Sequence, residues 1–381
     1  MRRLDYHWYA RSPWLLLLTP FSLLFRLAVT LRRYAYRSGL LRSQQPGVPV
    51  IVVGNITAGG TGKTPLVVWL SEYLRGKGYR PGIVARGYGG NARQWPQQVR
   101  ADSDPGSVGD EAVMLAGRTR CPMAVGPDRV AAARSLVEHS DCNVIISDDG
   151  MQHYALQRII EITVIDGVRR FGSGFMLPAG PLREPVGRLE TVDLVVVNGL
   201  GAGREHPMRV FIADAYRLSD GERHALTDFR QQPVRAVAGI GNPQRFFRAL
   251  SQSLRVVETH EFPDHHRFQP ADIEFGDTLP VFMTEKDAVK CRSFAGGDVW
   301  YVPAEVEMQE PFLERLDELL EQRVPLASEV RSAAAQLSGE CSGQEITRHP
   351  GLPGMLGTAP LREGGAGGCL QGGSYCVPDR E

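Results

Sequence analysis

The residues best suited to chemistry are Gly62, Lys63 and Thr64, which close a glycine-rich turn directly after the apolar run 48–53. In this order, glycines let backbone N–H groups surround phosphate oxygens, the lysine supplies charge for the β- and γ-phosphates, and the threonine hydroxyl can ligate Mg²⁺. The generic pattern has glycine where this chain has Thr57. The sequence still predicts a nucleotide phosphate loop formed by Thr57, Ala58, Gly59, Gly60, Thr61, Gly62, Lys63 and Thr64.

Two acids follow another apolar segment, residues 143–147. Asp148 and Asp149 stand directly after it and precede Gly150. Phosphate-loop enzymes place an acid of this kind at the end of a neighbouring strand, where it helps the loop hydroxyl to hold Mg²⁺. We therefore interpret Asp148 and Asp149, with Thr64, as metal ligands; the alternative is a pair of solvated acids in a turn.

Asp110 is a candidate for orienting an acceptor hydroxyl in phosphoryl transfer. It stands immediately before a helical pattern at 111–118, so it could equally serve as the N-cap of that helix. The residues alone leave both interpretations open.

Two further polar positions have functional and ordinary interpretations. Arg86 follows the apolar run 81–85, and at the carboxyl edge of a sheet it could contact a substrate phosphate or simply pair with a surface acid. The run 264–266, Asp-His-His, could ligate a metal, but neighbouring loop histidines are more often solvated or hydrogen-bonded. The six cysteines have no zinc-ligand spacing, which favours reduced thiols in a cytosolic compartment.

The amino-terminal segment is basic and apolar, although the whole chain carries 43 basic and 43 acidic residues. Residues 1–42 contain eight arginines against Asp5 alone. The apolar run 13–25 is interrupted by Pro20 and closed by Arg26, so we expect it to be too short for the ~20 residues of a membrane span. We predict a helix lying at an anionic membrane surface; the alternative is a helix packed on the protein's own core.

The rest of the chain alternates short apolar runs with helical patterns, which predicts an α/β fold with a doubly wound, mainly parallel sheet. A smaller α/β unit is expected to begin near Pro233; its Gly239-Ile-Gly241 is read as a tight strand-to-helix turn rather than a second phosphate loop. The glycine-rich residues after Arg331 are predicted to be disordered. The predicted divisions are 1–42, a membrane-interface arm; 43–232, the phosphate-loop core; 233–328, the smaller unit; and 329–381, the tail.

Several ordered segments resemble the tetraacyldisaccharide 4'-kinase (lipid A 4'-kinase) family over roughly residues 10–325. The similarity includes the phosphate loop with its departing threonine. The other segments that carry it are 85–89 (ARGYG), 109–111 (GDE), 148–153 (DDGMQH), 177–184 (LPAGPLRE), 262–265 (FPDH) and 284–287 (TEKD).

The resemblance implies ATP- and Mg²⁺-dependent transfer of the γ-phosphate to the 4'-hydroxyl of a tetraacyldisaccharide 1-phosphate, a lipid A precursor, at the cytoplasmic face of the bacterial inner membrane. It implies that Asp110 is the acceptor-orienting base, helped by His265. Asp149 would be the principal metal acid beside Asp148. The residues facing the disaccharide and its phosphate would be Arg86, Tyr88 and Gln152.

Two other classes remain to be compared. A membrane-cycling ATPase that acts as a binding switch usually has a lysine before the paired glycines, where this chain has Ala58. A nucleotide-dependent metal-insertion chaperone would require clustered Cys or His ligands, and the sequence has no such cluster. The expected partners are the lipid substrate and, through the arm, the membrane surface; no nucleic acid is expected.

Overall fold

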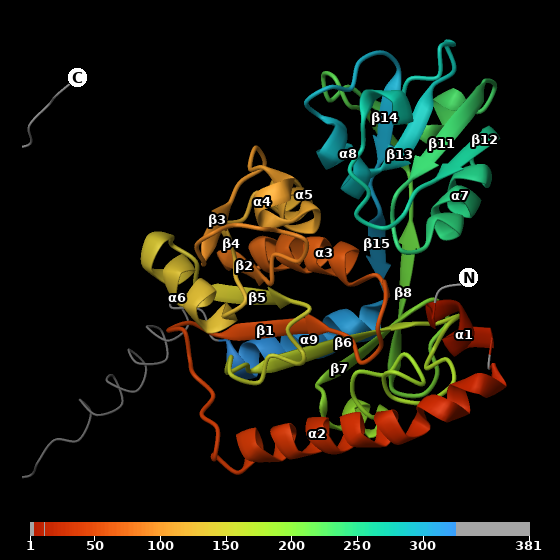
Figure 1. The fold of residues 1–381 in the computed structure, drawn as a ribbon. Coiled ribbons are helices and arrows are strands. Elements are labelled where there is room, and N and C mark those ends of the chain that lie inside the picture. The colour runs from red at the N-terminus through yellow and green to blue at the C-terminus, as the bar shows by residue number, and fades with distance from the viewer. Residues whose placement is uncertain (1–3, 11, 325–381) are drawn as a thin grey trace, which may run out of the picture. The chain divides into compact units, whose positions relative to one another are not determined.

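The computed structural model describes residues 4–10 and 12–324, which fall within a compact unit of residues 1–330. The expected disordered tail lies outside the described residues. Two sheets organise this unit, and we call the larger with its helices the P-loop lobe and the smaller with its helices the small lobe (Figure 1). The division at 232/233 stays a prediction.

The P-loop lobe is built on a nine-stranded sheet in the order β15-β8-β7-β6-β1-β5-β2-β4-β3, and β1 lies between β5 and β6. Neighbours from β8 to β4 are parallel, and the edge strands β15 and β3 are antiparallel. The predicted doubly wound, mainly parallel fold is therefore confirmed. The strands are β1 Val50–Gly54, β2 Pro81–Ala85, β3 Gln97–Val99, β4 Met123–Val125, β5 Val144–Asp148, β6 Ile160–Asp166, β7 Leu194–Asn198, β8 Glu205–Phe211 and β15 Glu305–Met308.

The apolar run of β1 is explained by helices on both faces of the sheet. Ile51 and Val53 point into a core shared with α3, α5 and α9, whereas Val50 and Val52 point into a core shared with α6 and α2. The helices of this lobe are α1 Leu4–Ala10, α2 Thr19–Arg37, α3 Lys63–Gly76, α4 Pro105–Val108, α5 Asp110–Thr119, α6 Arg129–His139 and α9 Glu310–Arg323, with 3-10 turns η1 Pro13–Leu18 and η2 Val186–Thr191.

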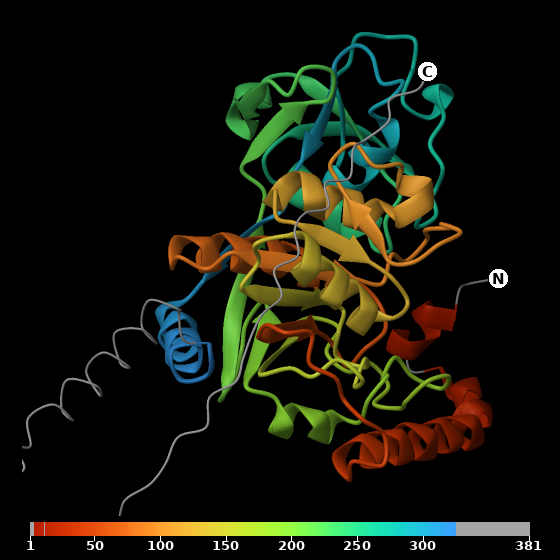
Figure 2. The same cartoon turned by 90° about the vertical axis from the view of Figure 1, so that its left-hand side faces the viewer.

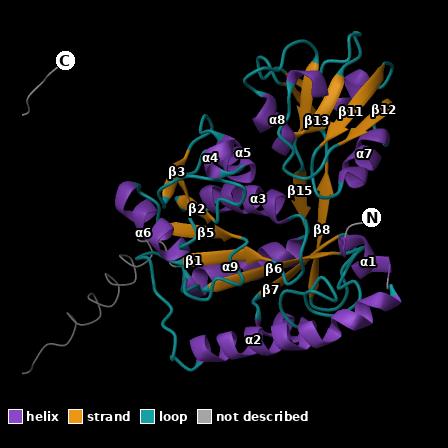
Figure 3. Cartoon of the chain, viewed as in Figure 1, coloured by secondary structure: helices purple, strands orange, loops and turns teal. Residues whose placement is uncertain are grey.

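The small lobe has a six-stranded sheet in the order β10-β9-β14-β13-β11-β12. Its helices α7 and α8 pack on opposite faces, because Phe247 of α7 and Cys291 of α8 belong to different cores. The chain passes from one sheet to the other after β8 and returns at β15, and these two strands pair (Figure 3). The elements are β9 Asp214–Arg217, β10 Arg223–Ala225, β11 Pro233–Ala238, β12 Arg255–Glu261, β13 Val281–Thr284, β14 Val299–Val302, α7 Pro243–Ser251, α8 Glu285–Cys291, η3 Leu226–Phe229 and η4 Pro270–Asp272.

The amino-terminal helix α2 lies along the outside of the P-loop lobe, as Figures 1 and 2 show from two directions. Buried Ser22 fixes one face, because its hydroxyl donates to the Met176 carbonyl (2.7 Å) and accepts from the Ala179 N–H (3.0 Å). Away from Ser22, α2 exposes Phe21, Leu23, Leu24, Leu27, Leu31 and Tyr34, and η1 just before it exposes Leu16 and Leu17.

The expected end of the apolar segment at Arg26 is wrong. Helical structure continues from Pro13 to Arg37, and these 25 residues are long and apolar enough, by length and composition, to cross a membrane. Pro20 does not break α2 because it stands in the first turn, where its missing N–H is not needed.

Candidate active site

The phosphate loop joins β1 to α3 and depends on glycine at two positions. Gly59 and Gly62 have φ of +105° and +98°, values that side chains rarely allow. A Cβ at Gly62 would lie 2.6 Å from the amide nitrogen of Asn198, which donates to the Thr61 carbonyl (3.1 Å). The loop can therefore approach β7 closely only with glycine at position 62.

Residues 181–184 hold the other side of the loop. The N–H of Ala58 donates to the Pro181 carbonyl, and the N–H of Arg183 donates to the Ile56 carbonyl, both at 2.7 Å. These backbone bonds fix the loop before any ligand arrives, which reduces the ordering cost of binding.

Asp149 follows β5 in a left-handed conformation, φ +48°. Its carboxylate lies 3.3 Å from Nζ of Lys63 and 3.0 Å from the guanidinium of Arg183, while Arg129 donates to its carbonyl (2.6 Å). Burial alone would raise the pKa of Asp149, but Lys63, Arg183 and Arg129 hold it below the ordinary value. Asp149 is therefore an ionised carboxylate already paired with cations.

Asp148, the last residue of β5, is buried and differs from its neighbour. Burial and the negative charge of Glu111 raise the pKa of Asp148 to about 7. Its Oδ1 atom has no hydrogen-bond partner among the described residues. A cation would supply the missing partner, so the donor set of Asp148 with Thr64, in the first turn of α3, fits Mg²⁺.

No group of three or more His, Cys, Asp or Glu side chains in residues 4–10 and 12–324 forms a metal cluster. The run 264–266 instead makes hydrogen bonds: His265 lies 3.1 Å from Asp110 and His266 lies 3.0 Å from Asp272. His266 is thus hydrogen-bonded within the small lobe, whereas His265 joins the candidate site.

Asp110 is the first residue of α5, and Gly109 occupies the N-cap position. The alternative that Asp110 is the cap is therefore wrong. Its carboxylate is buried and accepts from the N–H of Glu111 (2.9 Å), and its Oδ2 lies 3.1 Å from Nδ1 of His265, a residue of the small lobe. The pair joins the two lobes, and α5 also packs against α8 (Figure 1).

Two lysines of α8 surround this pair. Nζ of Lys286 lies 3.2 Å from both Glu111 and Asp264 and 4.0 Å from Asp110, and Nζ of Lys290 lies 3.8 Å from Asp110. Burial would raise the pKa of Asp110, but His265, Lys286 and Lys290 together lower it. Asp110 is thus kept ionised in a buried position, as a proton acceptor requires.

The hydrogen bond to Asp110 raises the pKa of His265, although burial and Lys286 oppose it. The stabilising effect is present below the unfolded pKa of histidine and is lost as pH rises through the higher folded value. His265→Asn is therefore expected to reduce the free energy of unfolding by about 1 kcal/mol at pH 5.5 and by less at pH 9. Urea unfolding at the two pH values measures this, with His139→Asn on α6 as control; an equal loss at both would contradict it.

The three residues predicted to bind substrate differ in exposure and in their hydrogen bonds. Arg86 and Tyr88 are exposed after β2, and the Tyr88 ring lies 5.3 Å from the His265 ring, so Tyr88 borders the Asp110 pair. Gln152 is committed to the protein, because its amide donates to the Asn55 carbonyl (3.0 Å) and to Glu184 (2.9 Å). Their contacts with substrate stay a prediction.

Sequence reasoning assigned no role to several residues at the site. Arg183 and Lys286 stand within the segments that carry the family resemblance, and that was the available signal. No sequence signal pointed to Arg129, Asn198 or Lys290, because each reaches the site from an element whose position depends on the complete fold.

A strand, a glycine loop and a helix at the carboxyl edge of a doubly wound parallel sheet, with acids after a neighbouring strand, define a P-loop nucleotide-binding protein. The chain belongs to the tetraacyldisaccharide-1-phosphate 4'-kinase family, whose model matches residues 14–321. The predicted resemblance is thereby confirmed.

Similar proteins and a solved structure agree with this assignment. The chain is 56% identical over 316 residues to tetraacyldisaccharide 4'-kinase of Nitrosococcus oceani, covering 83% of this chain and 94% of that protein. It is 51% identical to the enzyme of the same name from Methylobacillus flagellatus, covering 85% and 98%. The crystal structure of LpxK from Aquifex aeolicus in complex with ATP matches with a TM-score of 0.69 and 26% identity, covering 80% of this chain and 98% of that one.

Proposed function

We propose that the chain transfers the γ-phosphate of ATP to the 4'-hydroxyl of a tetraacyldisaccharide 1-phosphate, with Asp110 orienting the acceptor hydroxyl. Membership of the 4'-kinase family supports the reaction. The observation that supports the residue assignment is the buried, ionised Asp110 paired with His265 at 3.1 Å. Mg²⁺-ATP supplies the phosphoryl group and the charge neutralisation around it.

Different residues of the chain bind the phosphates, the cation and the acceptor hydroxyl. Backbone N–H groups of the loop and Lys63 would hold the phosphates, and Thr64 with Asp148 would provide oxygen ligands for the cation. The expected role of Asp149 as the principal metal acid stays a prediction. Asp149 keeps Lys63 in place through their ion pair. Asp110 accepts the hydrogen bond of the attacking hydroxyl, and His265 with the two lysines of α8 keeps it ionised.

The alternative function, a membrane-cycling ATPase, differs from a kinase in what stimulates its ATP consumption. A kinase consumes ATP in proportion to its lipid acceptor, whereas a binding switch responds to vesicles alone. We expect ATP consumption by the full chain to require detergent-dispersed tetraacyldisaccharide 1-phosphate and to be unaffected by acceptor-free vesicles. Turnover stimulated equally by both would favour the switch.

We also propose that α2 places the active site at the cytoplasmic surface of the inner membrane. Its exposed leucine and phenylalanine side chains, with arginines on the same helix, support an interfacial position. Its packing on the P-loop lobe through Ser22 supports this over a crossing helix, because the packed face would have to leave the lobe.

Leu24 and Leu27 are 64% and 55% exposed on α2. Replacing both with Gln is expected to weaken binding to vesicles at least about tenfold, since burying one leucine is worth about 1.5–3 kcal/mol. Flotation with phospholipid vesicles measures the change, and Leu200→Gln, at a 93% exposed leucine outside α2, is the matched control. Undiminished flotation of the double variant would place the anchor elsewhere.

A further inference from the structure

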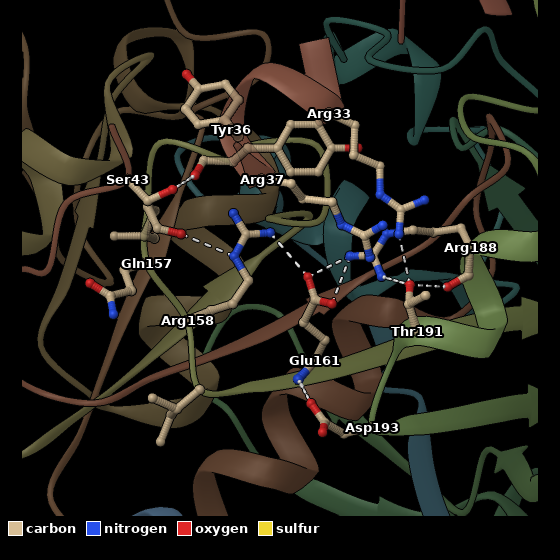
Figure 4. A pocket seen from close by; sticks show the side chains of 13 residues that line it. Arg33, Tyr36, Arg37, Ser43, Gln157, Arg158, Glu161, Arg188, Thr191 and Asp193 are labelled. Atoms are coloured by element: carbon tan, nitrogen blue, oxygen red, sulfur yellow. Dashed lines mark hydrogen bonds and ion pairs between the residues drawn. The ribbon is translucent and has the colours of Figure 1, made fainter. Parts of the chain in front are cut away.

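A hollow of about 310 Å³ lies between the last turns of α2 and the segments 154–161 and 188–193 (Figure 4), and no residue of the phosphate loop lines it. Its charged wall residues are Arg33 and Arg37 of α2 and, from the rest of the lobe, Arg158, Arg188, Glu161 and Asp193. Four arginines face two acids there. The α2 pocket, as we call it, therefore has more positive than negative charge.

The two acids are already neutralised by other groups. Glu161 lies 2.6 Å from the guanidinium of Arg188 and 3.2 Å from that of Arg158. Asp193 lies 2.6 Å from Arg323 of α9. No negative charge of the pocket wall is left for further arginines.

Arg33 and Arg37 supply the excess charge from the last turns of α2. Arg33 donates only to a neutral group, the Thr191 hydroxyl (2.8 Å), and neither arginine makes an ion pair with any residue in the described part of the chain. Burial, together with repulsion from Arg188 and Arg37, lowers the pKa of Arg33, although Tyr154 and Glu184 oppose it; Glu184 is itself paired with Arg188 at 3.2 Å. Figure 4 shows both side chains directed towards Arg188 and Thr191. An anion placed there would remove this repulsion.

We propose that the α2 pocket binds the phosphate group of an anionic glycerophospholipid. Guanidinium groups match phosphate oxygens with paired N–H donors, and an arginine without a carboxylate partner is free to use them. The membrane is the source because Leu27, Leu31 and Tyr34, in the turns of α2 that lead into the pocket and border it, expose an apolar surface beside which acyl chains can lie. This choice of source rests on the proposed position of α2 at the membrane.

The test compares two arginines of α2 that carry the same charge. Arg37 lines the pocket, whereas Arg26 is exposed outside it. Full-length protein and the variants Arg37→Gln, Arg33→Gln and Arg26→Gln are titrated with phosphatidylcholine vesicles that contain or lack phosphatidylglycerol. Loss of one surface charge weakens binding at most about fivefold. We expect Arg26→Gln to stay within that limit and Arg37→Gln and Arg33→Gln to lose at least about tenfold, only with phosphatidylglycerol present.

Four other outcomes would contradict the proposal or the membrane position on which it rests. Equal losses in Arg37→Gln and Arg26→Gln would overturn the pocket and leave only diffuse attraction. Thermal stabilisation by inorganic phosphate as large as that by dispersed phosphatidylglycerol would assign the pocket to free phosphate and overturn the lipid source. A raised KM for the disaccharide in phospholipid-free detergent, confined to Arg37→Gln, would overturn it in favour of the substrate's own phosphate. Failure of the unmodified protein to bind either vesicle would instead contradict the membrane position of α2.

Discussion

Asp110→Asn is expected to lower kcat for phosphate transfer by about 10²–10⁴-fold, the usual contribution of a positioned base, while ATP affinity stays nearly unchanged. The reason is geometric: the carboxylate contacts His265 and lies near two lysines of α8, and none of its hydrogen bonds or ion pairs goes to the phosphate loop. Asparagine keeps the size and removes the charge.

Label transfer from γ-labelled ATP gives kcat, and equilibrium titration with a non-hydrolysable ATP analogue gives affinity. Asp102→Asn, at an exposed aspartate just before α4, is the matched control. If Asp110→Asn turned over like the unmodified chain, Asp110 would have no part in the mechanism. If ATP affinity fell in parallel with kcat, its role would be in nucleotide binding.

Lys63→Ala is expected to lower kcat/KM for ATP by about 10²–10³-fold, because preorganised positive charge at the reacting phosphate is removed. Lys63 is only 13% exposed, and its Nζ lies 3.3 Å from Asp149. Folding should survive the change, since Arg183 still neutralises Asp149 at 3.0 Å.

Steady-state kinetics of label transfer measures the effect, and thermal unfolding checks the fold. Lys77→Ala is the control, because Lys77 caps the same helix at its other end and pairs with Asp317 on the surface. A loss below about tenfold in Lys63→Ala would show that the loop backbone alone holds the phosphates.

The phosphate loop and the strand-end acids were predictable because their signals are local. An apolar strand, a glycine turn and a Gly-Lys-Thr sequence occupy adjacent residues, so no long-range contact is needed to recognise them. The parallel sheet was predictable for the same reason, since continuous apolar runs such as 50–53 indicate strands covered on both faces.

The surroundings of Asp110 were harder to predict from the sequence. Lys290 approaches Asp110 only because α8 of the small lobe packs against α5 of the P-loop lobe, a contact between segments about 180 residues apart in the chain. The return of β15 to the first sheet has the same origin, because pairing with β8 depends on where the small lobe ends. The predicted apolar segment also ended too early, at Arg26. An arginine does not interrupt a helix such as α2, because its long side chain can extend into solvent.

The most direct test of the account is the position of the new phosphate. The full chain is incubated with ATP, Mg²⁺ and tetraacyldisaccharide 1-phosphate, and the product lipid is examined by phosphorus–proton correlation NMR. A second phosphate on the 4'-oxygen, absent when Asp110→Asn replaces the unmodified chain, is the predicted result. Phosphate at another position, or release of inorganic phosphate with the lipid unchanged, would contradict it.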